Sequence, residues 1–223
     1  MSQKRVSIFS FLLHSFLYVS LASAAVTPTF KDYFFRFTHS NPPREVLTYQ
    51  RLRGNFTNTP GVTPAPHNPQ DHFNRISLYN AEPEPHGPLY VVPTNPHPPP
   101  VPGYYGLSAR AGIPDAWQLI YTYRLEEEQS FGFRYEDWRL KRSKCKPTLK
   151  IWYGPEQDVE DGWRWYAVKG VSPMTGFEQW TAWWVKLSDA NEGAFADTEI
   201  VPVGLELVEA GPVNSNAPGG VEE

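Results

Sequence analysis

Proline and tryptophan are concentrated in different parts of this chain, and the prolines limit most strongly what the chain can fold into. Sixteen of the 23 prolines lie between Pro42 and Pro114, whereas all eight tryptophans lie between Trp117 and Trp184. Proline lacks a backbone hydrogen-bond donor and disrupts helices. Residues 25–115 are therefore predicted to form short strands that complete a fold whose core comes from the Trp-rich region.

Alternation of apolar and polar residues predicts β-strands throughout the Trp-rich region, residues 116–210. Within 117–125 an apolar or aromatic side chain occupies every second position, as in a half-buried strand. A turn at 126–129 and a strand at 131–138 would complete a hairpin. Other strands are expected at 33–38, 74–79, 89–92, 148–153, 163–168, 180–187 and 200–208. The one helical turn is expected within 188–196.

Short strands at this spacing, with no extended helical period, predict an all-β fold in a single domain. The first choice is an antiparallel β-sandwich of the jelly-roll kind, and the second is a closed lipocalin-like barrel. The sequence does not separate the two, because both need alternating strands and neither needs disulfides.

The first 24 residues have the arrangement of a secretory signal peptide. Two basic residues, Lys4 and Arg5, precede an apolar run at residues 6–22, and small residues in an A-x-A pattern end at Ala24. An uncleaved anchor is the alternative, but the run is short and contains several polar residues for a membrane span. We therefore expect cleavage and a secreted, extracellular protein.

Charge and polarity argue against several kinds of partner. The net charge of the chain is −4, and loss of the two basic leader residues would make it −4 − 2 = −6, which disfavours nucleic acid and anionic membranes. No later apolar run has transmembrane length, and residues 211–223 are expected to be a polar, flexible tail. No cofactor motif or metal-binding signature is recognised, so neither is expected.

Two positions bear on covalent chemistry in a secreted chain. Asn55 begins an Asn-Phe-Thr sequon, which is an acceptor site for N-glycosylation. Cys145 is the only cysteine, so no intramolecular disulfide is possible. The thiol is either incidental, reactive or a dimer bridge, and the oligomeric state stays open.

The density of tryptophan is the strongest indication of a function. Large flat rings either fill a core or, when exposed, stack on sugar rings. Trp183 and Trp184 are adjacent on one expected strand and must point to opposite faces, so at least one faces outward or lies under another layer. The candidate ligand-binding residues are Trp138, Trp163, Trp165, Trp183 and Trp184.

Carboxylates for glycan hydrolysis are few among the expected strands. Such a reaction needs two carboxyl groups about 5 to 10 Å apart. Glu136 and Glu178 are the speculative pair, since each precedes a tryptophan by two residues. The acidic residues within 156–161 are interpreted as a solvated turn, with a weak calcium site as the alternative.

One local basic patch interrupts the acidic chain. Six cations occur between residues 139 and 150 with no acid among them, and they would surround a hairpin tip able to hold a sulfate, uronate or phosphate group. A charged edge that prevents aggregation is the competing interpretation. The candidate anion-binding residues are Arg139, Lys141, Arg142, Lys144 and Lys146.

Together these features predict a secreted, soluble β-protein that binds a ligand or serves a structural role without catalysis. Carbohydrate is the preferred ligand class, and an extracellular glycan is the preferred partner. Two alternatives remain, namely a glycan-active hydrolase with paired carboxylates and a barrel that carries an apolar small molecule. No motif identifies a reaction.

Overall fold

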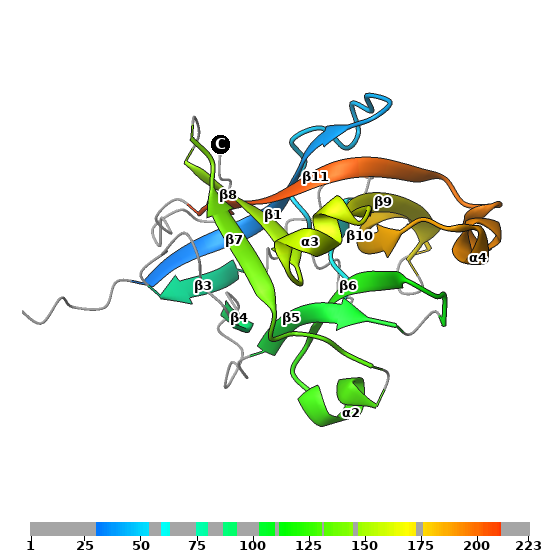
Figure 1. The fold of residues 1–223 in the computed structure, drawn as a ribbon. Helices are drawn as coiled ribbons and strands as arrows, with labels where there is room; N and C mark the ends of the chain where they lie inside the picture. The colour runs from blue at the N-terminus through cyan, green and yellow to red at the C-terminus, as the bar shows by residue number, and fades with distance from the viewer. Residues whose placement is uncertain are drawn as a thin grey trace, which may run out of the picture.

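A computed structural model shows that the chain is an antiparallel β-protein with a few short helices between strands (Figure 1). The structure describes residues 30–53, 59–62, 75–79, 87–92, 103–109, 112–130, 132–144, 147–172 and 176–210. The all-β prediction is confirmed. Residues 1–24, Asn55, Cys145 and residues 211–223, which carry predictions, lie outside the described residues.

The strands account for most of the described chain. Their bounds are β1 Phe30–Ser40, β2 Gly61–Val62, β3 Arg75–Tyr79, β4 Leu89–Val92, β5 Gly103–Ser108, β6 Ala116–Thr122, β7 Trp138–Arg142, β8 Thr148–Tyr153, β9 Trp163–Val171, β10 Glu178–Lys186 and β11 Ile200–Glu209. The helices are α2 Leu125–Gln129, α3 Glu156–Glu160 and α4 Asp189–Glu192, followed by the 3₁₀ turn η1 Gly193–Phe195.

All of these strands belong to one sheet. Their order is β1-β3-β4-β5-β6-β10-β9-β11-β8-β7, and β2 pairs with β10. Because β1 pairs with β3 on one edge and with β11 on the other, the sheet curls round on itself into a nearly closed barrel. This arrangement is consistent with the barrel alternative, and it places the Pro-rich and Trp-rich regions in a single sheet.

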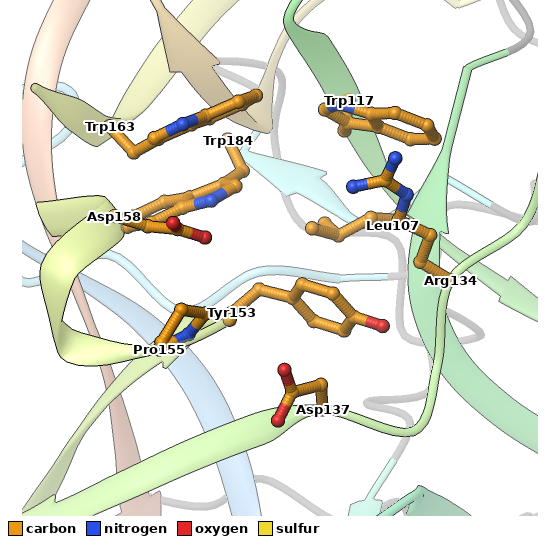
Figure 2. Close-up of a pocket in the computed structure, with 10 residues that line it drawn as sticks. Leu107, Trp117, Arg134, Asp137, Tyr153, Pro155, Asp158, Trp163 and Trp184 are labelled. Carbon is orange, nitrogen blue, oxygen red and sulfur yellow. The ribbon is translucent and has the colours of Figure 1, made fainter. Parts of the chain in front are cut away.

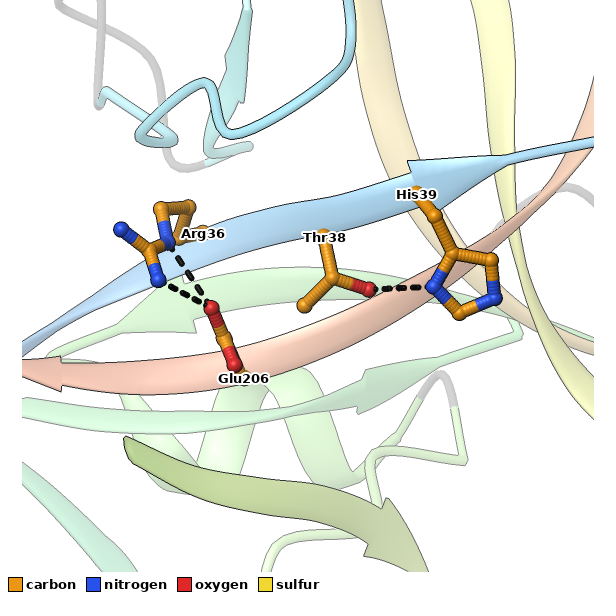
Figure 3. Close-up of polar contacts among 4 residues, drawn as sticks. All are labelled: Arg36, Thr38, His39 and Glu206. Carbon is orange, nitrogen blue, oxygen red and sulfur yellow. Dashed lines mark hydrogen bonds and ion pairs between the residues drawn. The ribbon is translucent and has the colours of Figure 1, made fainter. Parts of the chain in front are cut away.

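An ion pair marks the junction between β1 and β11. Arg36 and Glu206 are direct cross-strand partners, and Arg36 Nε donates a hydrogen bond of 2.9 Å to Glu206 Oε1 (Figure 3). Glu206 is buried, so its carboxylate needs such a partner. The ring of Tyr49 lies 5.2 Å from the Arg36 guanidinium carbon. These contacts favour the register that closes the sheet.

Stacked tryptophans form the centre of the main core. Trp138 and Trp165 lie parallel with ring centroids 6.3 Å apart, although they come from strands far apart in the sequence. Each indole N–H finds a partner: Trp138 donates to the Tyr105 carbonyl at 3.1 Å, and Trp165 donates to the Ile151 carbonyl at 2.7 Å. Burial of these rings therefore leaves neither indole donor unsatisfied.

A smaller apolar cluster lies on the other face of β9 and β10. It contains Tyr166, Val168, Trp183 and Val185 from these strands and is completed by Ala116 and Phe195. Phe195 belongs to η1, so the helical turn expected within 188–196 is confirmed and has a packing role. Asn191 holds this turn in place by donating to the carbonyls of Pro114 and Lys186 at 2.8 and 2.9 Å.

The expected hairpin after β6 is wrong in two respects. The expected turn at 126–129 lies in helix α2, whose residues are strong helix formers. Residues 132–137 form no strand, and only Arg134 pairs, in an isolated bridge with Leu107 of β5. The alternating aromatic residues of this segment pack against neighbouring strands. Phe133 is buried, and its ring lies so close to Gly106 that a Cβ atom at position 106 would collide with it.

Most other expected strands occur within a few residues of their predicted bounds. The strand β5 was not expected, because its Gly103 and Gly106 weaken the strand pattern. In the described part of the chain, none of the helices is long and apolar enough to span a membrane.

Candidate functional site

A pocket of about 160 Å³ opens between segment 132–137, the β8–α3 turn and the inner faces of β6 and β10 (Figure 2). Its walls combine aromatic rings with three charged side chains. The lining residues are Leu107, Trp117, Arg134, Asp137, Tyr153, Gly154, Pro155, Asp158, Trp163 and Trp184.

Three tryptophans of the pocket are positioned by adjacent strands. Trp184 of β10 lies opposite Trp117 of β6 in register. Trp163, the first residue of β9, stacks on Trp184 with ring centroids 6.2 Å apart and planes 16° apart. Trp184 is buried, whereas Trp117 and Trp163 are half-buried. Trp184 covers one face of Trp163, and Arg134 covers one face of Trp117. The two outer rings, on either side of the opening, therefore keep only part of their surface accessible.

Arg134 forms the cationic part of the wall. Its guanidinium carbon lies 3.8 Å from the centroid of the Trp117 ring, and the side chain is exposed. Two backbone hydrogen bonds of 2.8 Å with Leu107 fix the chain at this point. Among the described residues, no carboxylate lies within ion-pair distance of Arg134. Its charge is therefore available to a ligand.

The two pocket carboxylates have different surroundings. Asp137 forms an ion pair of 2.9 Å with Arg139. Asp158, on α3, forms no ion pair with another described residue, and its carboxylate lies against Gly154. A Cβ at Gly154 would collide with that carboxylate, and the positive φ of 81° also favours glycine there. Gly154 thus lets Asp158 approach the pocket.

Tyr153 connects the two sides of the pocket. Burial raises the pKa of its hydroxyl, while hydrogen bonds from the backbone of Asp137 and Glu136 and the charge of Arg134 oppose that shift. The side chain also packs edge-on against Trp138 with centroids 5.3 Å apart. At neutral pH the hydroxyl keeps its proton, and it points toward the space beside Arg134 and Asp137 (Figure 2).

The structure separates the five predicted ligand-binding tryptophans. Trp163 and Trp184 line the pocket. Trp138 and Trp165 are buried in the main core, and Trp183 is buried in the outer cluster against Phe195. Burial leaves these three rings no open face for a ligand, so they contribute to packing.

The predicted carboxylate pair does not line the pocket. Glu178 begins β10, six residues and about 20 Å along the strand from Trp184, and forms an ion pair of 3.1 Å with Lys169. Glu136 is exposed and forms a hydrogen bond with Tyr135. The carboxylates that share the pocket are Asp137 and Asp158.

The predicted anion-binding residues lie on the β7–β8 hairpin. Arg139 is paired with Asp137, and the exposed Lys141 lies 3.5 Å from Glu156. Arg142 and Lys144 are exposed, and Lys146 lies outside the described residues. Asp137 and Glu156 thus reduce the positive potential of the hairpin at Arg139 and Lys141.

Residues 156–161 form α3 and its end, so they are a helix and not an open acidic loop. No group of three or more His, Cys, Asp or Glu side chains is arranged to hold a metal ion among the described residues.

No protein-family model matches the chain, and neither a curated protein nor a solved structure is significantly similar to it. The pocket chemistry alone therefore supports the functional argument. Sequence reasoning missed Trp117, Arg134, Tyr153, Asp137 and Asp158 as a site because four separate segments contribute them. The one local signal was the Gly154-Pro155 turn, which places α3 beside the pocket.

Proposed function

We propose that this protein binds a carbohydrate in the aromatic pocket. The observation that carries the proposal is the pair of half-buried rings, Trp117 and Trp163, on opposite sides of an opening that also contains carboxylates. Aromatic faces suit the apolar C–H faces of a sugar ring. Carboxylate oxygens accept hydrogen bonds from sugar hydroxyls and so fix the orientation of the ring.

The size and polarity of the pocket favour one sugar unit over a lipid-like molecule. At about 160 Å³ the cavity is smaller than most drug-sized ligand sites. Three charged groups in its wall would be costly to bury against an apolar ligand. Inside the sheet, inward-facing side chains pack against one another as a core, which does not support the alternative of a carrier barrel.

A hydrolase remains the second candidate, because Asp137 and Asp158 line the same pocket. The carboxylate of Asp137 is already engaged by Arg139 at 2.9 Å, which leaves Asp158 as the one pocket carboxylate without an ion-pair partner among the described residues. We therefore prefer binding without catalysis. The leader-like first 24 residues support an extracellular glycan as the partner.

Retention of purified protein on immobilised polysaccharides, neutral and acidic, tests the proposal. Trp163→Ala should abolish retention, because it removes an accessible ring of the pocket. Phe177→Ala is the matched control: Phe177 is 58% exposed and does not line the pocket, so its loss should leave retention intact.

The proposal is wrong if no polysaccharide retains the wild type, or if both variants bind like the wild type. Release of reducing sugar that stops in Asp158→Asn would favour the hydrolase instead.

A further inference from the structure

The charges of the pocket specify the ligand further. Of the three charged side chains in its wall, Asp137 is already neutralised by Arg139 at 2.9 Å. Arg134 and Asp158 have no ion-pair partner among the described residues. A ligand that enters the pocket therefore meets one open cation and one open carboxylate on opposite walls (Figure 2).

The stacking of Arg134 restricts how it can donate. With the guanidinium 3.8 Å from the Trp117 centroid, one face of the group is covered by the indole. Its N–H donors lie in the guanidinium plane, and in Figure 2 one of its terminal nitrogens is directed toward the space between Trp117 and Trp184. A planar fork of donors held in this way matches two oxygens of a carboxylate.

The Tyr153 hydroxyl supplies a second donor on the same side. Its oxygen accepts hydrogen bonds from the backbone of Asp137 and Glu136, so its own O–H remains to donate to a ligand. In Figure 2 this hydroxyl lies below Arg134 and above Asp137. Arg134 and Tyr153 thus both supply donors on one side of the pocket, whereas Asp158, an acceptor, lies on the far wall.

We propose that the sugar bound here carries a carboxylate, as a uronic acid does, with Arg134 and Tyr153 donating to the carboxylate and Asp158 accepting from ring hydroxyls. This inference rests on the proposed function. It assigns specificity for acidic glycans to Arg134, a residue outside the basic hairpin patch of β7 and β8.

The test compares polygalacturonate with its methyl ester, which retains the sugar rings but lacks the charge. Wild-type protein should bind the acid about tenfold more tightly than the ester at low salt. Arg134→Gln should remove this preference by weakening binding of the acid alone. Arg134→Lys keeps the positive charge but lacks the planar guanidinium, so this variant should retain only part of the preference for the acid.

Lys141→Gln is the matched control, because Lys141 is an exposed cation on β7 that does not line the pocket. It should keep the full preference, and the melting temperatures of all variants should agree. A sulfated neutral polysaccharide serves as a further arm, and it should bind more weakly than the uronate.

Equal binding of acid and ester would overturn the inference and leave the proposed function standing. Loss of the preference in Lys141→Gln but not in Arg134→Gln would also overturn it and would place anion binding on the hairpin. If neither polymer nor any other glycan is bound, both the inference and the proposed function fail.

Discussion

Trp183 and Trp184 are neighbours on β10, yet they lie in two different environments. Trp183 points to the outer face, where Phe195 covers it edge-on at 6.0 Å and Thr181 Oγ1 accepts its indole N–H at 2.9 Å. Trp184 points to the inner face, where it contacts Trp163 and Trp165 and lines the pocket. Alternation along one strand thus divides adjacent tryptophans between a packing cluster and a candidate site.

The comparison shows that tryptophan density by itself does not indicate a binding surface. In the outer cluster, the turn formed by α4 and η1 packs Phe195 against Trp183. The inner face becomes a site only at the pocket, where segment 132–137 and α3 add charged groups to the rings. Mutations should therefore separate stability from binding according to the face and position of the ring.

The largest effect is expected from the centre of the main core. Trp138→Ala removes a fully buried ring that stacks on Trp165 and donates to the Tyr105 carbonyl. The free energy of unfolding should fall by about 3–5 kcal/mol, as measured by denaturant titration. A loss below about 1 kcal/mol would show that the ring is not closely packed.

A smaller loss of stability is expected from a substitution in the outer cluster. Phe195→Ala should lower the free energy of unfolding by roughly 2 kcal/mol, because it uncovers Trp183 without opening the main core. Retention on a glycan should not change, because Phe195 does not line the pocket. Weaker glycan binding at unchanged stability would contradict the division between the two faces.

Gly154→Ala should moderately lower both the stability of the protein and its affinity for a glycan. The added methyl group meets the Asp158 carboxylate, and the positive φ of 81° is strained for an L-residue such as alanine. We expect stability to fall by about 1–3 kcal/mol, with glycan binding weakened several-fold as Asp158 moves. Gly170→Ala is the control, since a methyl group there meets only open space. Equal effects of the two changes, measured by thermal melting and titration, would argue against the role given to Gly154.

The smallest change in stability is expected at alkaline pH, where Tyr153 loses its proton. Burial raises the pKa of Tyr153, so the folded protein holds this proton more tightly than the unfolded chain does. The resulting contribution to stability is complete below the ordinary tyrosine pKa of about 10 and is lost as pH rises through the folded pKa. Tyr153→Phe should therefore lose less stability than the wild type as pH rises past 10. If wild type and Tyr153→Phe show the same dependence of stability on pH, the pKa of Tyr153 is not raised by folding.

Much of the sheet was predictable from sequence because its strands alternate regularly. The expected 89–92 coincides with β4, and 148–153 coincides with β8. The segment 131–138 misled the prediction, since its aromatic alternation reflects packing against Gly106 and Tyr104 and not strand pairing. Local periodicity cannot distinguish these two causes.

The candidate site was only partly predictable. Trp163 and Trp184, two of the candidates selected by ring type, line the pocket, but no spacing rule joins them to Arg134 or Asp158. These residues meet because the nearly closed sheet brings β6, β9 and β10 to one pocket beside segment 132–137 and α3. The Glu136 and Glu178 pair failed to line it for the same reason, since a shared pattern along the chain does not fix proximity across the sheet.

The central claim is that a glycan contacts the inner tryptophans of the pocket and not the outer cluster. Indole N–H signals in a nitrogen-15 NMR spectrum, assigned with single Trp→Phe variants, report on each ring separately during titration with an oligosaccharide. We predict that the signals of Trp117, Trp163 and Trp184 shift with a common affinity while the Trp183 signal stays in place. A saturable shift of Trp183, with the three pocket signals unchanged, would contradict the account.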